Sequence, residues 1–499
     1  MVRTGIRLFV VLLAVTFPAI VWAGERVALV IGMGDYRNVA SLKNTVNDAR
    51  AISAALDSIG FKVTTVIDAT HDELRKTIDD FAFRSETAEL ALIYFAGHGV
   101  EVQGENFLIP VDANIKSNTD IQKQSVSLKD FLRAVDRARK MRIVILDSCR
   151  NNPFGDLIRL DVATPSGGGD ASTRSIRRGL APPTPDRGTL VAFAARDGEV
   201  ALDGDGDNSP FAMALVDKLT RPGLEISLMF RQVRDQVLKT THNLQEPHTY
   251  GSLSGIPFYI AGPTDDQRDA EAVDRRVAWS AIRPEQEQQL AKLAQGGDTR
   301  SMLGLAYIRL NPEEDRFAPE KAVDYLTRAA AAGSSEAQFE LAKLYETGIG
   351  VEQDPKRALE LFRQSAENDF PDALNDLGFM YYQGGLGLAR DTDKALALFE
   401  RAADLRHPQA MFNFAALIDD GLVATKGPED AAQYLYMALR SGSADVFKIL
   451  NERPKMFTSA TRKALQAKLS EYGFYKGSID GDFGPGTKRG VRAAYGLSD

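Results

Sequence analysis

The stretch MRIVILDSCRNNPF, from Met141 to Phe154, joins an apolar run to the only cysteine in the 499 residues of this chain. Residues 143–146 are large and mostly β-branched, which is typical of a strand buried on both faces of a parallel sheet. Cys149 comes just after this run. Because ligands bind at the carboxyl ends of the strands in open α/β sheets, the thiol stands where we expect a nucleophile.

A histidine follows a second apolar run in the same way. Residues 89–96, ELALIYFA, indicate another buried strand, and GHG at residues 97–99 comes directly after it. We expect the two glycines to turn the backbone tightly and to bring the imidazole of His98 to the same rim of the sheet.

Together, Cys149 and His98 favour thiol catalysis. A free thiol is mostly protonated at neutral pH and only the thiolate is reactive, so His98 would serve as the base. Taken singly, a cysteine is often a small buried apolar residue and a histidine a structural group, but their joint position at strand ends favours catalysis. A zinc site needs three or four nitrogen or sulfur ligands, and this chain has one cysteine and five scattered histidines.

The segments YFAGHG around His98 and LDSC around Cys149 resemble the histidine and cysteine motifs of the caspase-like peptidases, in their prokaryotic, metacaspase-like branch. The resemblance extends over about residues 25–262 and includes the segments RVALVIG, NDA, GTLVAFAA, NSPF and QEP. It implies an α/β domain with a mainly parallel sheet flanked by helices, and a cysteine-type endopeptidase activity.

The resemblance also implies roles for residues at the rim. His98 would take the proton of Cys149 and later give it to the leaving amine. The backbone amides of Gly99 and Cys149 would stabilise the oxyanion, at the positions that the family uses. Asp147 resembles the acidic residue of metacaspases, whose pocket accepts Arg or Lys. The alternative is that it only accepts hydrogen bonds from loop amides, but a buried carboxylate usually needs a cationic partner, which favours the pocket.

The segment DGDGDN, residues 203–208, has the composition of a calcium loop without its pattern. Asn208 stands at the sixth place, where an EF-hand has glycine, and Ala214 stands at the twelfth, where it has glutamate. We interpret the segment as a solvated acidic loop, with a part in the pocket for basic residues or a calcium site as the alternatives. No cofactor or metal is therefore expected, and calcium stays the open alternative.

Residues 156–188 have the composition of a long exposed loop, with SGGG, APPTP and no sustained periodicity. In the caspase-like family the corresponding loop divides a large from a small subunit, and its cleavage is often how the enzyme matures. Arg174, Arg177 and Arg178 lie in this segment. They are candidates for self-cleavage by a protease specific for basic residues, because proteolysis needs an extended chain.

The N-terminus has the pattern of a signal peptide over residues 1–23. Arg3 and Arg7 precede an apolar run at residues 8–20 that is too short for a comfortable membrane span, and small residues suit cleavage after Ala23. An uncleaved anchor is the alternative. We expect an exported protein of the periplasm or cell envelope, with no membrane span after cleavage.

Composition narrows the classes of partner. The net charge of -8 argues against nucleic acid, because binding to phosphates needs a concentrated basic face. A single cysteine can form no internal disulfide in an oxidising compartment, which favours a reactive thiol. The expected partner of the first half of the chain is a protein or peptide substrate.

The second half, after a charged linker at residues 263–285, is repetitive. Similar segments recur at intervals of 36 or 37 residues, beginning at Leu326, Phe362, Phe399 and Tyr436. This period predicts stacked helix pairs over residues 286–445. The segment AQFELAKLYETGIG resembles the Sel-type variant of the tetratricopeptide repeat, which implies an α-solenoid whose concave face binds a partner protein.

Residues 457–499 resemble a small, all-α peptidoglycan-binding module, through the segments GFYKG and IDGDFG. Ala494-Tyr495 stands where the family usually has an aromatic-glutamine pair, so the resemblance implies the fold more strongly than the binding of peptidoglycan. A three-helix bundle without a ligand is the alternative.

The whole sequence therefore indicates a multidomain, exported, caspase-like cysteine endopeptidase that cuts after Arg or Lys, carries a protein-binding solenoid and is tethered to the cell wall. The alternative is a non-catalytic envelope scaffold or regulator, which uses the peptidase fold and the repeats for binding alone.

Overall fold

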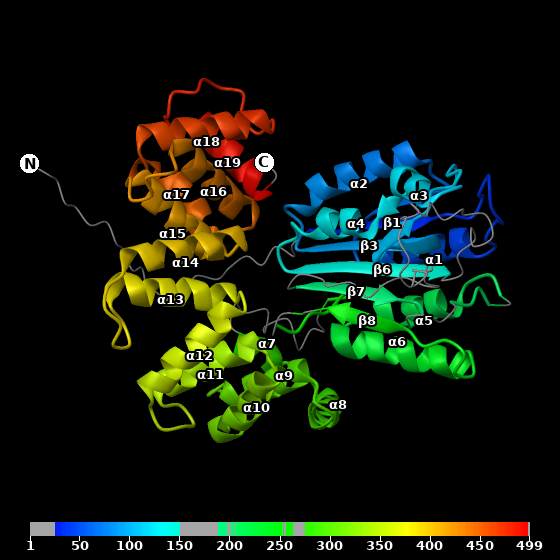
Figure 1. Cartoon of the computed structure of the whole chain (residues 1–499), viewed down its shortest axis with the longest axis horizontal. Helices are drawn as coiled ribbons and strands as arrows, with labels where there is room; N and C mark the ends of the chain where they lie inside the picture. The colour runs from blue at the N-terminus through cyan, green and yellow to red at the C-terminus, as the bar shows by residue number, and fades with distance from the viewer. Residues whose placement is uncertain are drawn as a thin grey trace, which may run out of the picture.

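The structure, a computed structural model, describes residues 25–149, 188–196, 201–204, 206–251, 253, 256–262 and 275–497. The predicted signal peptide, the loop with the three candidate cleavage arginines, and the first part of the predicted linker lie outside these residues. Figure 1 shows an α/β unit, coloured blue to green, beside an array of helices coloured green to red.

The α/β unit is built on a mainly parallel sheet, as predicted. Its strands lie in the order β2-β1-β3-β6-β7-β8. Neighbours from β2 to β7 are parallel, β8 is antiparallel to β7, and the short strands β4 and β5 extend from β3. The bounds of the strands are Arg26–Gly32 (β1), Lys62–Ile67 (β2), Leu90–Val102 (β3), Glu105–Leu108 (β4), Val126–Ser127 (β5), Met141–Cys149 (β6), Thr189–Phe193 (β7) and His248–Gly251 (β8).

Helices cover both faces of this sheet and form two apolar cores. One core includes helices Thr45–Ser58 (α1), Pro210–Leu219 (α5) and Ile226–Thr240 (α6), and the other includes His71–Ser85 (α2), Asn118–Gln124 (α3) and Leu128–Val135 (α4). Strand β6 supplies Ile143 and Ile145 to the first core and Val144 and Leu146 to the second, all at most 1% exposed. Each such side chain contributes about 1.5–3 kcal/mol of transfer free energy. The two-sided burial predicted for residues 143–146 is confirmed.

The helical array consists of successive antiparallel helices that pack on their neighbours in sequence. Its helices are Arg275–Ser280 (α7), Pro284–Gln295 (α8), Thr299–Leu310 (α9), Pro319–Ala331 (α10), Ser335–Thr347 (α11), Pro355–Glu367 (α12), Pro371–Gln383 (α13), Thr392–Asp404 (α14), Pro408–Asp419 (α15) and Pro428–Arg440 (α16). Proline at the first turn of most of these helices costs no hydrogen bond, because the first amides have no partner within a helix. The solenoid predicted from the repeats is confirmed.

The chain ends in a small all-α group, formed by Ala444–Glu452 (α17), Ser459–Glu471 (α18) and Pro485–Tyr495 (α19), with the short 3-10 helix Pro454–Met456 between the first two. Within the described part of the chain, no helix combines the length and the apolar character needed to cross a membrane.

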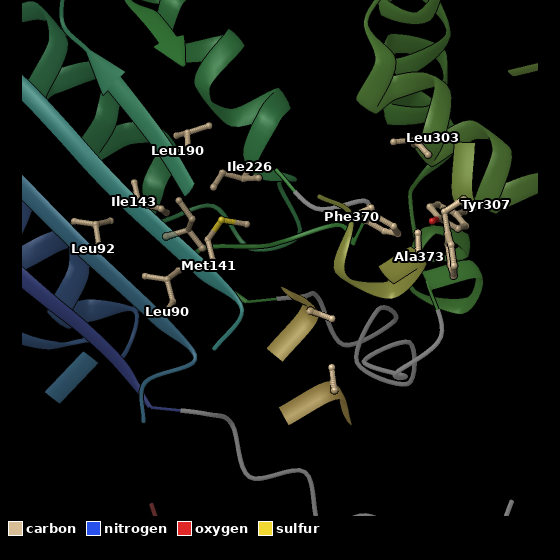
Figure 2. Close-up of a cluster of buried hydrophobic side chains, with 14 of the residues drawn as sticks. Leu90, Leu92, Met141, Ile143, Leu190, Ile226, Leu303, Tyr307, Phe370 and Ala373 are labelled. Atoms are coloured by element: carbon tan, nitrogen blue, oxygen red, sulfur yellow. The ribbon is translucent and has the colours of Figure 1, made fainter. Parts of the chain in front are cut away.

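The solenoid packs against the α/β unit. The first core continues from the sheet into the helical array, and Figure 2 shows Leu92, Ile143 and Leu190 of the sheet together with Tyr307 and Phe370 of the array. Ion pairs also join the two parts: Arg300 donates to Glu225 at 2.8 Å, and Arg440 to Glu86 at 3.0 Å. These contacts could not be predicted from sequence, because their partners lie far apart along the chain.

Candidate active site

The register of two parallel strands brings the predicted dyad together. His98 of β3 is the direct partner of Cys149 of β6, one step beyond the pair Gly97 and Ser148. Neighbouring strands lie about 4.8 Å apart, so the two backbones are adjacent at the carboxyl end of the sheet. The side chain of Cys149 lies outside the described part of the structure.

The imidazole of His98 is held in one tautomer. It is 6% exposed, and its Nε2 lies 3.1 Å from the carbonyl oxygen of Ala40. A carbonyl can only accept, so Nε2 carries the hydrogen and Nδ1 keeps its lone pair. Nδ1 is buried and makes no hydrogen bond within the described residues. It is therefore available to accept a proton.

Burial sets the protonation state of this histidine. Loss of hydration lowers the pKa of His98 below its ordinary value of 6.5, although the hydrogen bond to Ala40 and the charge of Asp203 partly oppose this. The imidazole is consequently neutral at neutral pH, which is the form that a general base requires.

The tight turn expected at residues 97–99 is wrong. Strand β3 runs without interruption from Leu90 to Val102 and continues into the antiparallel pair with β4, where Gly99 faces Leu108. Neither glycine has a positive φ. Gly97 is required by space instead, since a Cβ there would lie 2.7 Å from the hydroxyl of Tyr36. Gly99 lies directly after His98 on the strand, and its role as an oxyanion donor stays a prediction.

Asp147 is buried beside this rim, on the strand face that Cys149 shares by its spacing. Its carboxylate accepts hydrogen bonds from the hydroxyls of Tyr94 at 3.0 Å and Ser209 at 2.7 Å. No cation contacts it within the described residues. Burial, followed by the charge of Asp48, raises its pKa to about 7. Within the described residues its partners are these two hydroxyls, and the amides of residues 150–187 lie outside that part of the structure.

Asp48 is a second buried carboxylate that sequence reasoning missed. It lies on α1, is 2% exposed, and accepts hydrogen bonds from the Asn208 side chain and the Ser209 amide, both at 2.9 Å. Burial is the main reason why its pKa is raised. The available signal was an acidic residue among the apolar positions of the helix face around Ala49 and Ile52.

The segment at residues 203–208 lies against the start of α1. The Asn44 side chain donates to the carbonyls of Asp203 at 2.6 Å and Gly206 at 3.1 Å, and Asn47 donates to that of Asp207 at 3.1 Å. The described residues of this segment are largely exposed, which agrees with a solvated loop, and asparagine side chains also hold its backbone. No group of three or more potential metal ligands occurs within the described residues, which do not include Asp205.

The fold and the adjacent histidine and cysteine define a caspase-like α/β domain, and comparison with known proteins agrees. Residues 25–256 match the model of the caspase domain. Residues 299–334, 335–370 and 371–407 match the Sel1 repeat, and residues 458–494 match the putative peptidoglycan binding domain. The chain thus consists of a caspase-like domain, Sel1 repeats and a peptidoglycan-binding module, as the three sequence resemblances predicted.

Similar proteins are known from mammals. The human mucosa-associated lymphoid tissue lymphoma translocation protein 1 is 31% identical over 138 residues, which are 27% of this chain and 16% of the human protein. Its homologue from Mus musculus is 30% identical over 138 residues, with the same coverage. This chain thus spans only a small part of these relatives. Among solved structures, a Sel1 repeat protein from Oxalobacter formigenes matches with 23% identity and a TM-score of 0.32, covering 44% of this chain and 58% of that protein.

Proposed function

We propose that this chain is a cysteine endopeptidase that hydrolyses peptide bonds in proteins after Arg or Lys. The observation that supports catalysis is the strand register, which makes His98 and Cys149 direct neighbours at the ligand-binding rim. The caspase-like fold supports the same reaction class.

The reaction divides into two proton transfers. Nδ1 of His98 takes the proton of the Cys149 thiol, and the thiolate attacks the carbonyl carbon of the scissile bond. The backbone amides of Gly99 and Cys149 stabilise the developing oxyanion. The imidazolium then gives its proton to the leaving amine, and water hydrolyses the resulting thioester with His98 again as the base.

The preference for basic residues rests on the buried carboxylates. Asp147 and Asp48 lie in one acidic environment: the charge of Asp48 raises the pKa of Asp147, and the charge of Asp203 raises the pKa of both. A guanidinium or ammonium group that enters this environment supplies the missing counter-charge. An acidic substrate side chain adds another carboxylate, which costs several kcal/mol in a desolvated site.

The other modules would determine where in the cell envelope the enzyme is located. Sel1 repeats suggest binding of a partner protein, and the C-terminal module suggests attachment to peptidoglycan. Both fit an exported protein of the periplasm or cell envelope whose signal peptide, residues 1–23, is removed.

A chloromethyl ketone on a peptide ending in Arg tests this function. We expect it to label wild type rapidly and to leave Cys149→Ala unlabelled. His98→Ala is the matched control, because it keeps the thiol and loses the base. Equal labelling of wild type and His98→Ala would show that the thiol is reactive without being catalytic, and the scaffold alternative would then stand.

A further inference from the structure

A buried tyrosine contacts His98 from two directions. Tyr36 is 6% exposed and lies in the segment between β1 and α1. Its hydroxyl accepts a hydrogen bond from the backbone amide of His98 at 2.8 Å and donates to the carbonyl of Ile109 at 3.2 Å. Its ring packs on the imidazole with a centroid distance of 4.6 Å and an interplanar angle of 48°.

The hydroxyl bridges the His98 amide and the Ile109 carbonyl beside the end of β1. The ladder between β1 and β3 ends at the pair Gly32 and Ala96, where the Met33 amide still donates to the Ala96 carbonyl. Beyond this point the segment after β4 lies along the same edge of β3, and the Ile109 amide donates to the His98 carbonyl at 3.0 Å. The next amide in this position is that of His98, and a buried amide without an acceptor is costly. The Tyr36 hydroxyl supplies the acceptor.

The same short segment also holds the other end of the imidazole, because Ala40 supplies the carbonyl for Nε2. The segment is itself fixed: the Asp68 carboxylate accepts from the amides of Gly34 at 2.7 Å and Asp35 at 2.9 Å. Backbone position, ring face and tautomer of His98 thus depend on one anchored segment, residues 33–42.

We propose that Tyr36 is a positioning residue for His98: its hydroxyl fixes the backbone of the histidine and its ring fixes and shields the imidazole. This inference rests on the proposed function for its kinetic consequence, but the positioning itself can be observed without turnover. A shift of about 1 Å in a general base is enough to lower the rate substantially, because proton transfer requires hydrogen-bond contact.

Two substitutions separate the hydroxyl from the ring. Tyr36→Phe keeps the ring and leaves the His98 amide without its acceptor. We expect kcat on an Arg peptide to fall about tenfold, which is a part of the rate acceleration that a general base supplies. KM should stay nearly unchanged, because Tyr36 is assigned no contact with substrate. Tyr345→Phe, on α11, is the matched control and should retain wild-type kcat.

Tyr36→Leu also removes the ring, so water reaches the imidazole. We expect the titration midpoint of His98 to rise toward its ordinary value, since burial is what lowers it, and to stay in place in Tyr36→Phe. Within the described residues the charge of Asp203 acts on this imidazole, and neither substitution changes that residue. NMR of labelled histidine in the Cys149→Ala background measures the midpoint without activity, with His98→Ala to assign the signal.

The outcomes are distinct. Wild-type kcat in Tyr36→Phe, or an unchanged His98 midpoint in Tyr36→Leu, would overturn the positioning role. A wild-type chain that cleaves no peptide, while its His98 midpoint moves as expected in Tyr36→Leu, would overturn the proposed function and leave the positioning of His98 supported.

Discussion

Asp147 has two hydroxyl partners and, within the described residues, no cationic partner. Ionisation of a buried carboxylate without a counter-charge is unfavourable in free energy. Its pKa of about 7 means that much of the population is neutral at physiological pH. His98, whose pKa is lowered by burial, ionises in more acidic solution. Burial thus shifts the two pKa values in opposite directions, and an Asp147 variant distinguishes their effects on activity.

The first prediction concerns this separation. In the free enzyme, Asp147 is protonated and uncharged below about pH 7 and becomes a carboxylate above it. We expect kcat/KM for an Arg peptide to rise as pH increases through about 7, because only the charged pocket attracts a guanidinium. In Asp147→Asn the rise of kcat/KM near pH 7 should disappear, whereas the rise at lower pH, caused by deprotonation of His98, should remain. The substitution should also lower kcat/KM by about 100-fold. The measurement is kcat/KM as a function of pH for wild type and Asp147→Asn. The same rise near pH 7 in both proteins would contradict its assignment to ionisation of Asp147.

The second prediction concerns the dyad. Cys149→Ala and His98→Ala should each lower kcat by at least about 100-fold, and the double variant should lose no more than the single ones, because the two side chains act as a unit. Circular dichroism should show unchanged secondary structure. Additive losses in the double variant would indicate that the residues act independently.

At the scale of elements, the strand ends could be predicted because an apolar run of β-branched residues has few alternatives to a buried strand. The sequence could not distinguish a turn from a continuing strand at Gly97. Glycine is favoured both where φ is positive and where another group lies too close for a Cβ, and at Gly97 the close group is the Tyr36 hydroxyl. Asp48 was missed for a related reason. Its burial depends on Asn208 and Ser209, which lie 160 residues further along the chain or more.

The third prediction concerns residues 150–187, which lie outside the described part of the structure. If the enzyme cuts after basic residues, wild type should accumulate two fragments split between about Arg174 and Arg178, and Cys149→Ala should stay whole. Replacing Arg174, Arg177 and Arg178 with alanine should prevent the split, whereas replacing them with lysine, the matched control, should preserve it. Mass spectrometry of the purified proteins shows the fragments. A wild-type chain that remains whole and is fully active on Arg peptides would show that this loop is not a maturation site.

At the scale of the whole molecule, one arginine of the solenoid contacts both the C-terminal module and the caspase-like domain. Arg440 is 7% exposed, donates to Glu86 at 3.0 Å and to the carbonyl of Ala494 at 3.1 Å, and lies over the rings of Phe83 and Phe474. Three modules thus meet at a single guanidinium.

The departure of the C-terminal module from its family lies at this junction. The ring of Tyr495 packs under Arg139 of the caspase-like domain and stacks on Phe447 of α17. The carbonyl of Ala494 accepts from Arg440. The tyrosine at position 495 is therefore explained by docking within the chain, because its ring makes these contacts. The sequence of the module alone could not have predicted the contacts with Arg139 and Arg440, because both arginines belong to other modules.

The fourth prediction tests this junction. Arg440→Met keeps an unbranched, largely apolar side chain and removes the guanidinium, which leaves Glu86 buried with Arg137 as its remaining partner. Breaking one partner of a buried ion pair costs about 3–5 kcal/mol, and the retained Arg137 should place the loss at the lower end of that range. Arg453→Met, at an exposed position after α17, is the matched control and should have little effect. The thermal unfolding midpoint gives the direction of the change, and hydrogen exchange locates it.

A double-mutant cycle separates the ion pair from the packing around it. Glu86→Gln removes the buried charge, so Arg440→Met should cost much less in that background than in wild type. Faster amide exchange should appear together at the end of α2 and in α19, because one guanidinium holds both. If amide exchange accelerates only in the solenoid, contacts other than Arg440 hold the C-terminal module on the caspase-like domain.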